Sequence, residues 1–339
     1  MPDSLLHPSH RFSVAPMLDW TDRHCRHFLR LLSSQTMLYT EMVTTGAIIF
    51  GKGDYLSFGQ SEHPVVLQLG GSDPIAMAKC ARIAQERGYD EININVGCPS
   101  DRVKNGSFGA CLMSTPDIVA SCILAMKQEV DIPITVKCRI GIDDMDEEQG
   151  LTDFVSPLVD VGLEHLIVHA RKAWLQGLSP KENRDVPPLN YERVYRLKQE
   201  FSDVHMSING GIKTLEQAKV HLQHVDGVMM GREVYSNPYL LSEVDAVLFG
   251  KTDATAVSRA DVIESMSNYI REQHSQGVRV WHIARHTLGL FQGQPGGKIW
   301  RRYLSQNGTG KHNDPALLLR AYEQVLIAQE KAQTFSQNH

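Results

Sequence analysis

The chain has 339 residues and a formal net charge of −5, with 42% hydrophobic and 22% charged residues. These values are typical of a globular protein, and no apolar run approaches the roughly 18 residues of a membrane-spanning helix. The six cysteines form neither a CxxC pair nor a dense framework, which excludes a zinc ribbon and a disulfide-stapled scaffold.

The N-terminal stretch, MPDSLLHPSH, lacks the basic segment followed by an apolar segment that is typical of a secretory signal. Scattered, unpaired cysteines suit a reducing compartment. We therefore expect a cytoplasmic protein without a membrane segment.

Short β-type runs alternate with helix-type segments as far as about residue 235. Their apolar content is nearly continuous, as expected for parallel strands that are covered on both faces. Amphipathic helices are predicted between several of them, for instance over 73–88, where Asp73 is the expected N-cap and Gly88 the expected stop, and over 115–130. The predicted strands are 12–16, 37–40, 65–69, 91–95, 134–138, 165–169, 205–209 and 226–230.

Eight such units match the size and repeat of a (β/α)₈ barrel, the TIM-barrel fold. A doubly wound sheet is the competing architecture, but it would carry a GxGxxG motif after its first strand, where this chain has APMLDWTDR. The fold class predicted is therefore α/β, a TIM barrel followed by an all-helical domain.

The pattern changes near Ala260, where strand signals stop and 3.6-residue periodicity begins. Four segments, 260–277, 282–292, 298–306 and 315–335, predict a C-terminal helical bundle. The expected domains are a catalytic barrel over 1–248, a linker over 249–260 and a helical domain over 261–339.

The segment from Gln273 to Asn313 contains no Asp or Glu, although the chain as a whole is mildly acidic. Aromatic residues and histidines are interleaved with its cations, which predicts a local basic surface for a polyanionic partner. The alternative is an ordinary solvated basic face. The cations are Arg279, Arg285, Lys298, Arg301, Arg302 and Lys311.

Functional residues of a TIM barrel gather at the C-terminal ends of its strands. The last two predicted strands are followed by glycine-bearing turns, Asn209-Gly210-Gly211 and Gly231-Arg232. Backbone N–H groups in such turns bind phosphate, and Arg232 adds positive charge. Each glycine alone is equally typical of an ordinary turn, but the pair favours a phosphate site.

Gln68 and Lys137 end central strands with polar side chains in otherwise apolar runs. Burying such groups is costly unless each has a partner, and the isoalloxazine ring of a flavin would suit both. A structural salt bridge remains the alternative for Lys137, as a core histidine does for His169. No motif for haem, NAD or a metal ion is present, so no metal site is expected.

Cys98 lies between Gly97 and Pro99 where the fourth predicted strand ends. This setting predicts an exposed thiol on a stiff backbone, whereas Cys80, Cys122 and Cys138 fall inside helices or strands and suit inert packing. Beside a flavin, which delivers hydride, a thiol that supplies a proton is favoured over a nucleophile.

The stretch ININVGCPSDRVKNGSFGA (92–110), together with APMLDWTDR, VVLQLGG, VKCRIGID, HAR, NGGI and GR, resembles the tRNA-dihydrouridine synthase family. The resemblance spans nearly the whole chain. Within the family the chain is most similar to the bacterial A-type branch, which acts at positions 20 and 20a of the tRNA D-loop.

This resemblance implies an FMN-dependent, NADPH-driven reduction of uridine in which Cys98 protonates C5 while hydride reaches C6. It implies that Asn95 hydrogen-bonds the target uridine. It also implies an FMN site made of Pro16, Met17, Leu18, Gln68, Lys137, His169, Asn209, Gly210, Gly211, Gly231 and Arg232.

A target base inside a folded tRNA must be extruded into the pocket while phosphate contacts hold the RNA. Lys298 and Arg301, three residues apart on one helical face, are the first expected contacts, with Arg302 beside them. Lys181 and Arg184 follow on the loop after the sixth strand. The alternatives are an FMN oxidoreductase of a free pyrimidine, similar to dihydroorotate dehydrogenase, and a non-catalytic RNA-binding protein.

Overall fold

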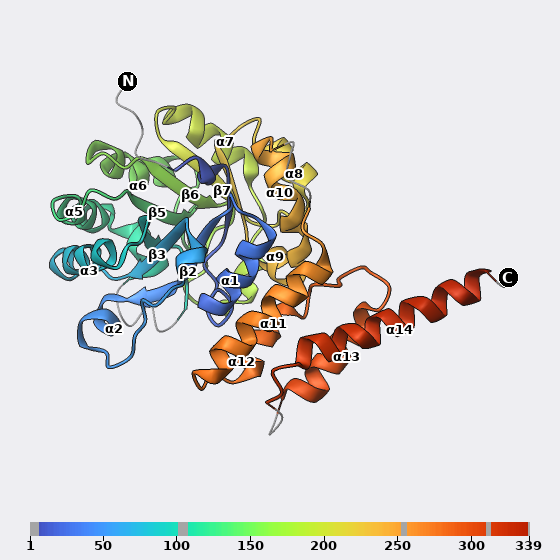
Figure 1. Cartoon of the computed structure of the whole chain (residues 1–339). Coiled ribbons are helices and arrows are strands. Elements are labelled where there is room, and N and C mark those ends of the chain that lie inside the picture. Colours follow the sequence, from blue (N-terminus) through green and yellow to red (C-terminus); the bar gives the residue numbers. More distant parts are fainter. Residues whose placement is uncertain (1–6, 101–107, 252–255, 310–312, 338–339) are drawn as a thin grey trace. The chain divides into compact units, whose positions relative to one another are not determined.

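The computed structural model describes residues 7–100, 108–251, 256–309 and 313–337, and its strands form one closed parallel barrel (Figure 1). The strands are β1 (Phe12–Val14), β2 (Met37–Thr44), β3 (Val65–Gly70), β4 (Glu91–Val96), β5 (Ile134–Arg139), β6 (His165–His169), β7 (His205–Asn209) and β8 (Gly227–Met230). Strand β1 pairs with both β2 and β8, which closes the sheet. The TIM barrel and the eight predicted strands are thus confirmed, and the doubly wound alternative is excluded.

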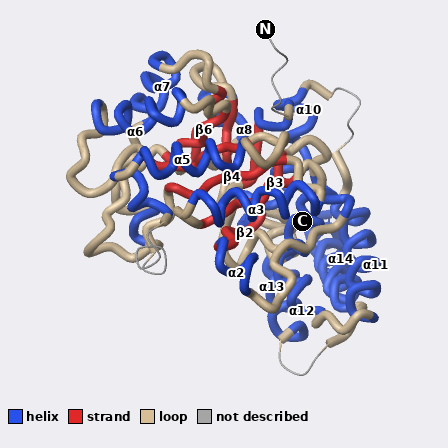
Figure 2. The backbone as a smooth tube through the Cα atoms, turned by 90° about the vertical axis from the view of Figure 1, so that its left-hand side faces the viewer, coloured by secondary structure: helices blue, strands red, loops and turns tan. Residues whose placement is uncertain are grey.

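Helices cover the outside of the barrel, as Figure 2 shows for α3, α5 and α6. The predicted cap of α3 is confirmed, because the Asp73 carboxylate accepts from the N–H groups of Ile75 and Ala76 and Gly88 takes the left-handed conformation with a φ of 89°. Besides the strands, residues 1–19 and 36–231 contain η1 (Pro8–Arg11), which precedes β1, and α2 (Thr45–Phe50), η2 (Gln60–Glu62), α3 (Pro74–Arg87), η3 (Gly109–Ser114), α5 (Pro116–Lys127), α6 (Gln149–Asp160), η4 (Glu182–Arg184), α7 (Tyr191–Glu200) and α8 (Leu215–His221), which lie between the strands.

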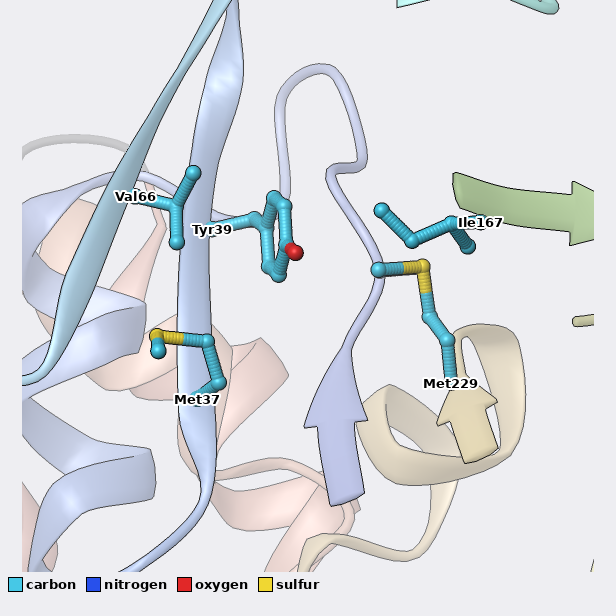
Figure 3. Packing of buried hydrophobic residues seen from close by; sticks show 6 residues of the cluster. Met37, Tyr39, Val66, Ile167 and Met229 are labelled. Atoms are coloured by element: carbon cyan, nitrogen blue, oxygen red, sulfur yellow. The ribbon is translucent and has the colours of Figure 1, made fainter. Parts of the chain in front are cut away.

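The barrel interior is filled by side chains that different strands contribute to one layer (Figure 3). Tyr39 extends toward Ile167 and Met229 from across the barrel, and all three side chains are fully buried. Burial raises the pKa of the Tyr39 phenol well above its usual value, and Glu91 adds to this effect. The phenol therefore stays neutral inside the barrel.

The chain divides into two compact units, which are residues 1–19 with 36–231 and residues 20–35 with 232–339. The second unit contains α1 (Arg23–Leu32), α9 (Arg232–Ser236), η5 (Pro238–Glu243), α10 (Val244–Phe249), α11 (Arg259–Ser275), α12 (Val280–Ala284), η6 (Arg285–Thr287), α13 (Gly297–Gly308) and α14 (Leu317–Gln337). In the described part of the chain, no helix combines the length and apolarity needed to cross a membrane.

Segments far apart in the sequence are joined inside the second unit by Asp22, the N-cap of α1. Its carboxylate accepts from Arg285 Nη2 at 3.0 Å and lies 3.1 Å from His286 Nε2. Burial by itself would raise the pKa of Asp22, but the contact with His286 holds that pKa well below its usual value. Trp20 also stacks on Tyr235, with ring centroids 4.3 Å apart.

The packing of α1 with the C-terminal helices was not predicted, and the compact units do not coincide with the ranges 1–248 and 261–339. Those domain ranges remain a prediction about function. Residues 252–255 of the predicted linker lie outside the described residues.

One predicted helix, 282–292, is wrong in its second half. The helical turns end at Thr287, and residues 288–293 form turns. Gly289 lies so close to Ser236 that an added Cβ would be 2.4 Å from its carbonyl oxygen, and Gly293 has a φ of 72°. Both positions favour glycine, which interrupts a helix.

We predict that the second unit loses stability in acid because two of its histidines are held neutral. Burial lowers the pKa of His24 and of His27 from 6.5 to about 4 each, and both rings contact Tyr269. As the pH falls, these histidines therefore bind protons in the unfolded chain before they do so in the folded protein. The free energy of unfolding keeps its full value above pH 6.5 and decreases as the pH drops from 6.5 toward 4, by at most about 3 kcal/mol per ring. Urea unfolding at several pH values measures this, and His27→Gln should flatten the dependence. An unchanged slope in that variant would contradict the assignment.

Candidate active site

A line of amide side chains crosses the C-terminal half of the barrel from β3 to β4. Gln68 Nε2 donates to Asn93 Oδ1 at 2.8 Å, and Asn95 Nδ2 donates to Gln68 Oε1 at 2.8 Å. Asn93 Nδ2 donates in turn to Thr135 Oγ1 on β5 at 3.0 Å. Asn93 and Asn95 share a face because they are two residues apart on a strand. One N–H and one lone pair of the Gln68 amide are left for a ligand.

Asn95 also fixes the backbone that carries Cys98. Its Oδ1 accepts from the N–H of Gly97 at 3.1 Å and from the N–H of Cys98 at 3.0 Å. On the other side, the Cys98 carbonyl accepts from Ala110 N at 2.9 Å. The backbone that carries the thiol is therefore held by a side chain of β4. Residues 101–107 lie outside the described residues.

The Cys98 side chain is half-buried, and its Sγ lies 3.5 Å from Ser100 Oγ. The prediction of an exposed thiol is thus corrected, because the Cys98 side chain is only partly accessible. The expectation for Cys80, Cys122 and Cys138 is confirmed, since all three are buried. Burial raises their pKa values to about 11, 12 and 12.

Lys137 on β5 reaches Asn209 on β7, where its Nζ donates to Oδ1 at 3.2 Å. Asn209 is itself fixed, because its Nδ2 donates to the carbonyl of Met229 at 2.8 Å. Among the described residues, the partner is a neutral amide and not the carboxylate that a structural salt bridge would require. Burial, with a smaller contribution from Arg139, lowers the pKa of Lys137 to about 8. A ligand that carries negative charge would stabilise this ammonium group.

Arg139 is a positioning residue whose role the strand-end pattern did not reveal. Its side chain is 3% exposed, and it donates to three carbonyls, Gly97 at 2.9 Å, Lys172 at 2.9 Å and Asn183 at 3.0 Å. The loops after β4 and β6 are thereby joined next to Cys98. The signal was available in the sequence, because Arg139 is two residues after Lys137 and lies on the same face of β5.

Asn183 is fully buried, and its role was not predicted from the sequence. Its side chain accepts from the N–H of Trp174 at 2.7 Å and donates to the Trp174 carbonyl at 2.9 Å. No local pattern identifies a loop asparagine as buried, so this role depends on the tertiary structure. The predicted RNA contacts Lys181 and Arg184 flank Asn183 and are exposed.

The glycine turn after β7 requires glycine at both positions. Gly210 and Gly211 have φ values of 118° and 70°. A Cβ on Gly210 would be 2.7 Å from His169 Cδ2, and one on Gly211 would be 2.6 Å from Leu189 Cδ1. The backbone conformation and the close contacts explain why both positions are glycine. The predicted role of this turn in phosphate binding stays a prediction.

The segment after β1 lies next to the end of β8. Ala15 N donates to the Met230 carbonyl at 2.8 Å, and a Cβ on Gly231 would be 3.5 Å from Met17 Sδ. Pro16 and Met17 are half-buried, whereas Leu18 is 61% exposed. Arg232 is the first residue of α9 and is exposed.

The predicted RNA contacts of the C-terminal region lie on α13 in the second unit. Lys298 is exposed, and Arg301 is half-buried with its Nη1 donating to Gln292 Oε1 at 2.9 Å. Arg302 follows Arg301 on the same helix and is exposed. Lys311 lies outside the described residues.

We predict that Arg139→Met destabilises the protein, because three carbonyls, in one buried and two partly buried hydrogen bonds, lose their donor at once. The expected loss is roughly 2–4 kcal/mol in urea unfolding. The exposed Arg82, which forms only a 3.4 Å pair with Glu129, provides the matched control, and Arg82→Met should stay within about 0.5 kcal/mol of the parent. Equal effects of the two substitutions would refute the positioning role of Arg139.

The comparisons with known proteins agree with this architecture. The chain is 64% identical over 303 residues to the tRNA-dihydrouridine(20/20a) synthase of Escherichia coli K12, covering 89% of this chain and 88% of that protein. It is 59% identical over 321 residues to the enzyme of the same name from Shewanella oneidensis, covering 94% of this chain and 96% of that protein.

Among solved structures, a 2-naphthoyl-CoA reductase complex matches with a TM-score of 0.52 at 11% identity and covers 69% of this chain and 49% of that chain. At this identity the match shows a similar fold and nothing more. The family model described as "Dihydrouridine synthase (Dus)" matches residues 13–327. The chain therefore belongs to the dihydrouridine synthase family.

Proposed function

We propose that this protein reduces uridines at positions 20 and 20a of the tRNA D-loop to 5,6-dihydrouridine. Family membership and the names of its relatives support a tRNA substrate. The observation that carries the proposal is the placement of Cys98, a half-buried thiol whose backbone N–H is bound by Asn95 at the C-terminal end of the barrel. This end is where TIM barrels perform chemistry.

The residues at this end of the barrel suit FMN. Gln68 retains a donor and an acceptor for the pyrimidine edge of the flavin, and Lys137 has only a neutral partner, so its charge is available to the ring. The turn at Gly210 and Gly211 leaves backbone N–H groups free of Cβ crowding, as a phosphate site requires. Bound FMN, once reduced by NADPH, supplies hydride for C6 of the uracil.

Cys98 then supplies the other half of the reduction. Saturating the C5–C6 bond adds one hydride and one proton, and the thiol donates the proton to C5 and is reprotonated from water. Asn95 Nδ2 uses one hydrogen on Gln68, which leaves its second N–H for a uracil carbonyl. Because Asn95 also binds the Cys98 backbone, one side chain sets the distance between the base and the acid.

The RNA is held by phosphate contacts from two regions. Lys181 and Arg184 are exposed on the loop after β6, and Lys298, Arg301 and Arg302 lie on α13. The segment from 273 to 313, which includes α13, contains no acidic residue, and this favours phosphate contacts by the cations on α13.

The direct test is to incubate the purified protein with FMN, NADPH and tRNA that lacks dihydrouridine, and to map the product base by base. We expect dihydrouridine at positions 20 and 20a. Cys98→Ala should keep its flavin absorption and tRNA binding while turnover falls by roughly 10²- to 10⁴-fold, the usual contribution of a general acid.

Cys111→Ala is the matched control, since Cys111 is also half-buried and its Sγ only contacts the Phe108 carbonyl. This variant should remain active. Full activity of Cys98→Ala would contradict the proton-donor role, and reduction of free uridine or orotate but not tRNA would support the free-pyrimidine alternative.

A second prediction concerns the RNA surface. The double reversal Lys298→Glu with Arg301→Glu should weaken tRNA binding, because each cation that is removed no longer neutralises a phosphate. The slope of log affinity against log salt should fall by about 1 for each such phosphate. The control is Lys79→Glu with Arg82→Glu, an equally spaced pair on α3. If both double variants bind tRNA equally well, the RNA-binding surface lies elsewhere.

A further inference from the structure

A cluster of three histidines and one carboxylate lies at the base of the barrel, at the opposite end of the strands from Cys98. His10 belongs to η1, which leads into β1, and Glu91, His165 and His205 are the first residues of β4, β6 and β7. His10, Glu91 and His165 are each 1% exposed, and His205 is half-buried. The ring centroids of His10 and His165 are 4.3 Å apart, and those of His165 and His205 are 4.7 Å apart.

Hydrogen bonds orient the members of this cluster but do not satisfy all of them. His10 Nε2 lies 2.5 Å from Glu91 Oε2, and Thr135 Oγ1 donates to the other carboxylate oxygen at 2.7 Å. His165 Nε2 is bonded to Ser207 Oγ at 2.9 Å, which leaves the buried Nδ1 of His165 with no partner among the described residues. Such an unpaired buried nitrogen needs an explanation.

The same atoms match a ligand set for a metal ion. One potential ligand atom from each of His10, Glu91 and His165 lies within 4.8 Å of the other two. Two imidazoles and one carboxylate, with water in fourth place, are a ligand set that zinc takes in proteins. Ligand atoms at about 2.0–2.2 Å from a tetrahedral ion lie roughly 3.4 Å from one another. Small side-chain rotations would bring the three ligand atoms to this spacing.

The surrounding hydrogen bonds match those that accompany metal ligands. Metal-bound imidazoles and carboxylates are typically held by a hydrogen bond to the atom that does not face the ion. Ser207 holds His165 in this way, and Thr135 holds Glu91, whereas the Nδ1 atom of His10 has no partner among the described residues. Burial lowers the pKa of His165 well below its usual value, so the ring is neutral and has a free lone pair.

We propose that His10 Nε2, Glu91 Oε2 and His165 Nδ1 bind one divalent transition-metal ion of zinc-like ligand preference. The ion replaces the direct contact between His10 Nε2 and Glu91 Oε2. The ion joins η1 to β4 and β6 at the end of the barrel that stabilises the fold.

The full-length protein, stripped with a chelator, is titrated with Zn²⁺ and separately with Co²⁺. We expect about one tightly bound ion per chain, a higher melting temperature at saturating metal, and the visible absorption of four-coordinate Co²⁺. A wild-type protein that takes up neither ion overturns the proposal.

Two variants identify the ligands without reference to enzymatic activity. His165→Gln should lose this ion, whereas His221→Gln, which removes a buried histidine bonded to Tyr195 outside the cluster, should keep it. Ser207→Ala removes only the hydroxyl that bonds His165 and should weaken metal binding by about 10- to 100-fold. If His165→Gln does not fold, the Ser207→Ala variant tests the assignment of His165 as a ligand. Undiminished binding by His165→Gln, or by Ser207→Ala in its place, would refute the assignment.

Discussion

The structure depends first on the closure of a parallel sheet, in which β1 pairs with both β2 and β8. Parallel strands joined by crossovers direct all their C-terminal ends to one side, and closure brings those ends around a common axis. Lys137 and Asn209 can therefore form a hydrogen bond although they are 72 residues apart in the chain. Every contact proposed for the flavin and the base depends on this geometry.

The second constraint is the cost of burying polar groups without partners, which most polar side chains inside the barrel avoid by pairing. A continuous series of hydrogen bonds runs from the base of the barrel to its functional end, and it begins at the carboxylate of Glu91. Hydrogen bonds linked in this way polarise one another. The orientation of Asn95, and with it the backbone at Cys98, is thus coupled to the charge at the base. The members in order are Glu91, Thr135, Asn93, Gln68, Asn95 and Cys98.

Much of the fold was predictable because its signals are local. The apolar runs identified all eight strands, and Asp73 and Gly88 identified both ends of α3, since capping is decided within a few residues. The helix predicted over 282–292 failed beyond Thr287 because close packing at Gly289 overrides local periodicity. The placement of α1 with the C-terminal helices was not foreseen, because it depends on Asp22 meeting side chains more than 260 residues away.

The sequence by itself determined the barrel, the family and the residue types available for chemistry, since periodicity and motif spacing are properties of short segments. Only the tertiary structure decided which side chains meet. It showed that Cys98 is half-buried and held by Asn95, that Arg139 joins two loops, and that His10, Glu91 and His165 converge at the base. These contacts join residues from different strands. Strand register and barrel closure determine which of these residues lie within reach of one another, and no short segment encodes either of them.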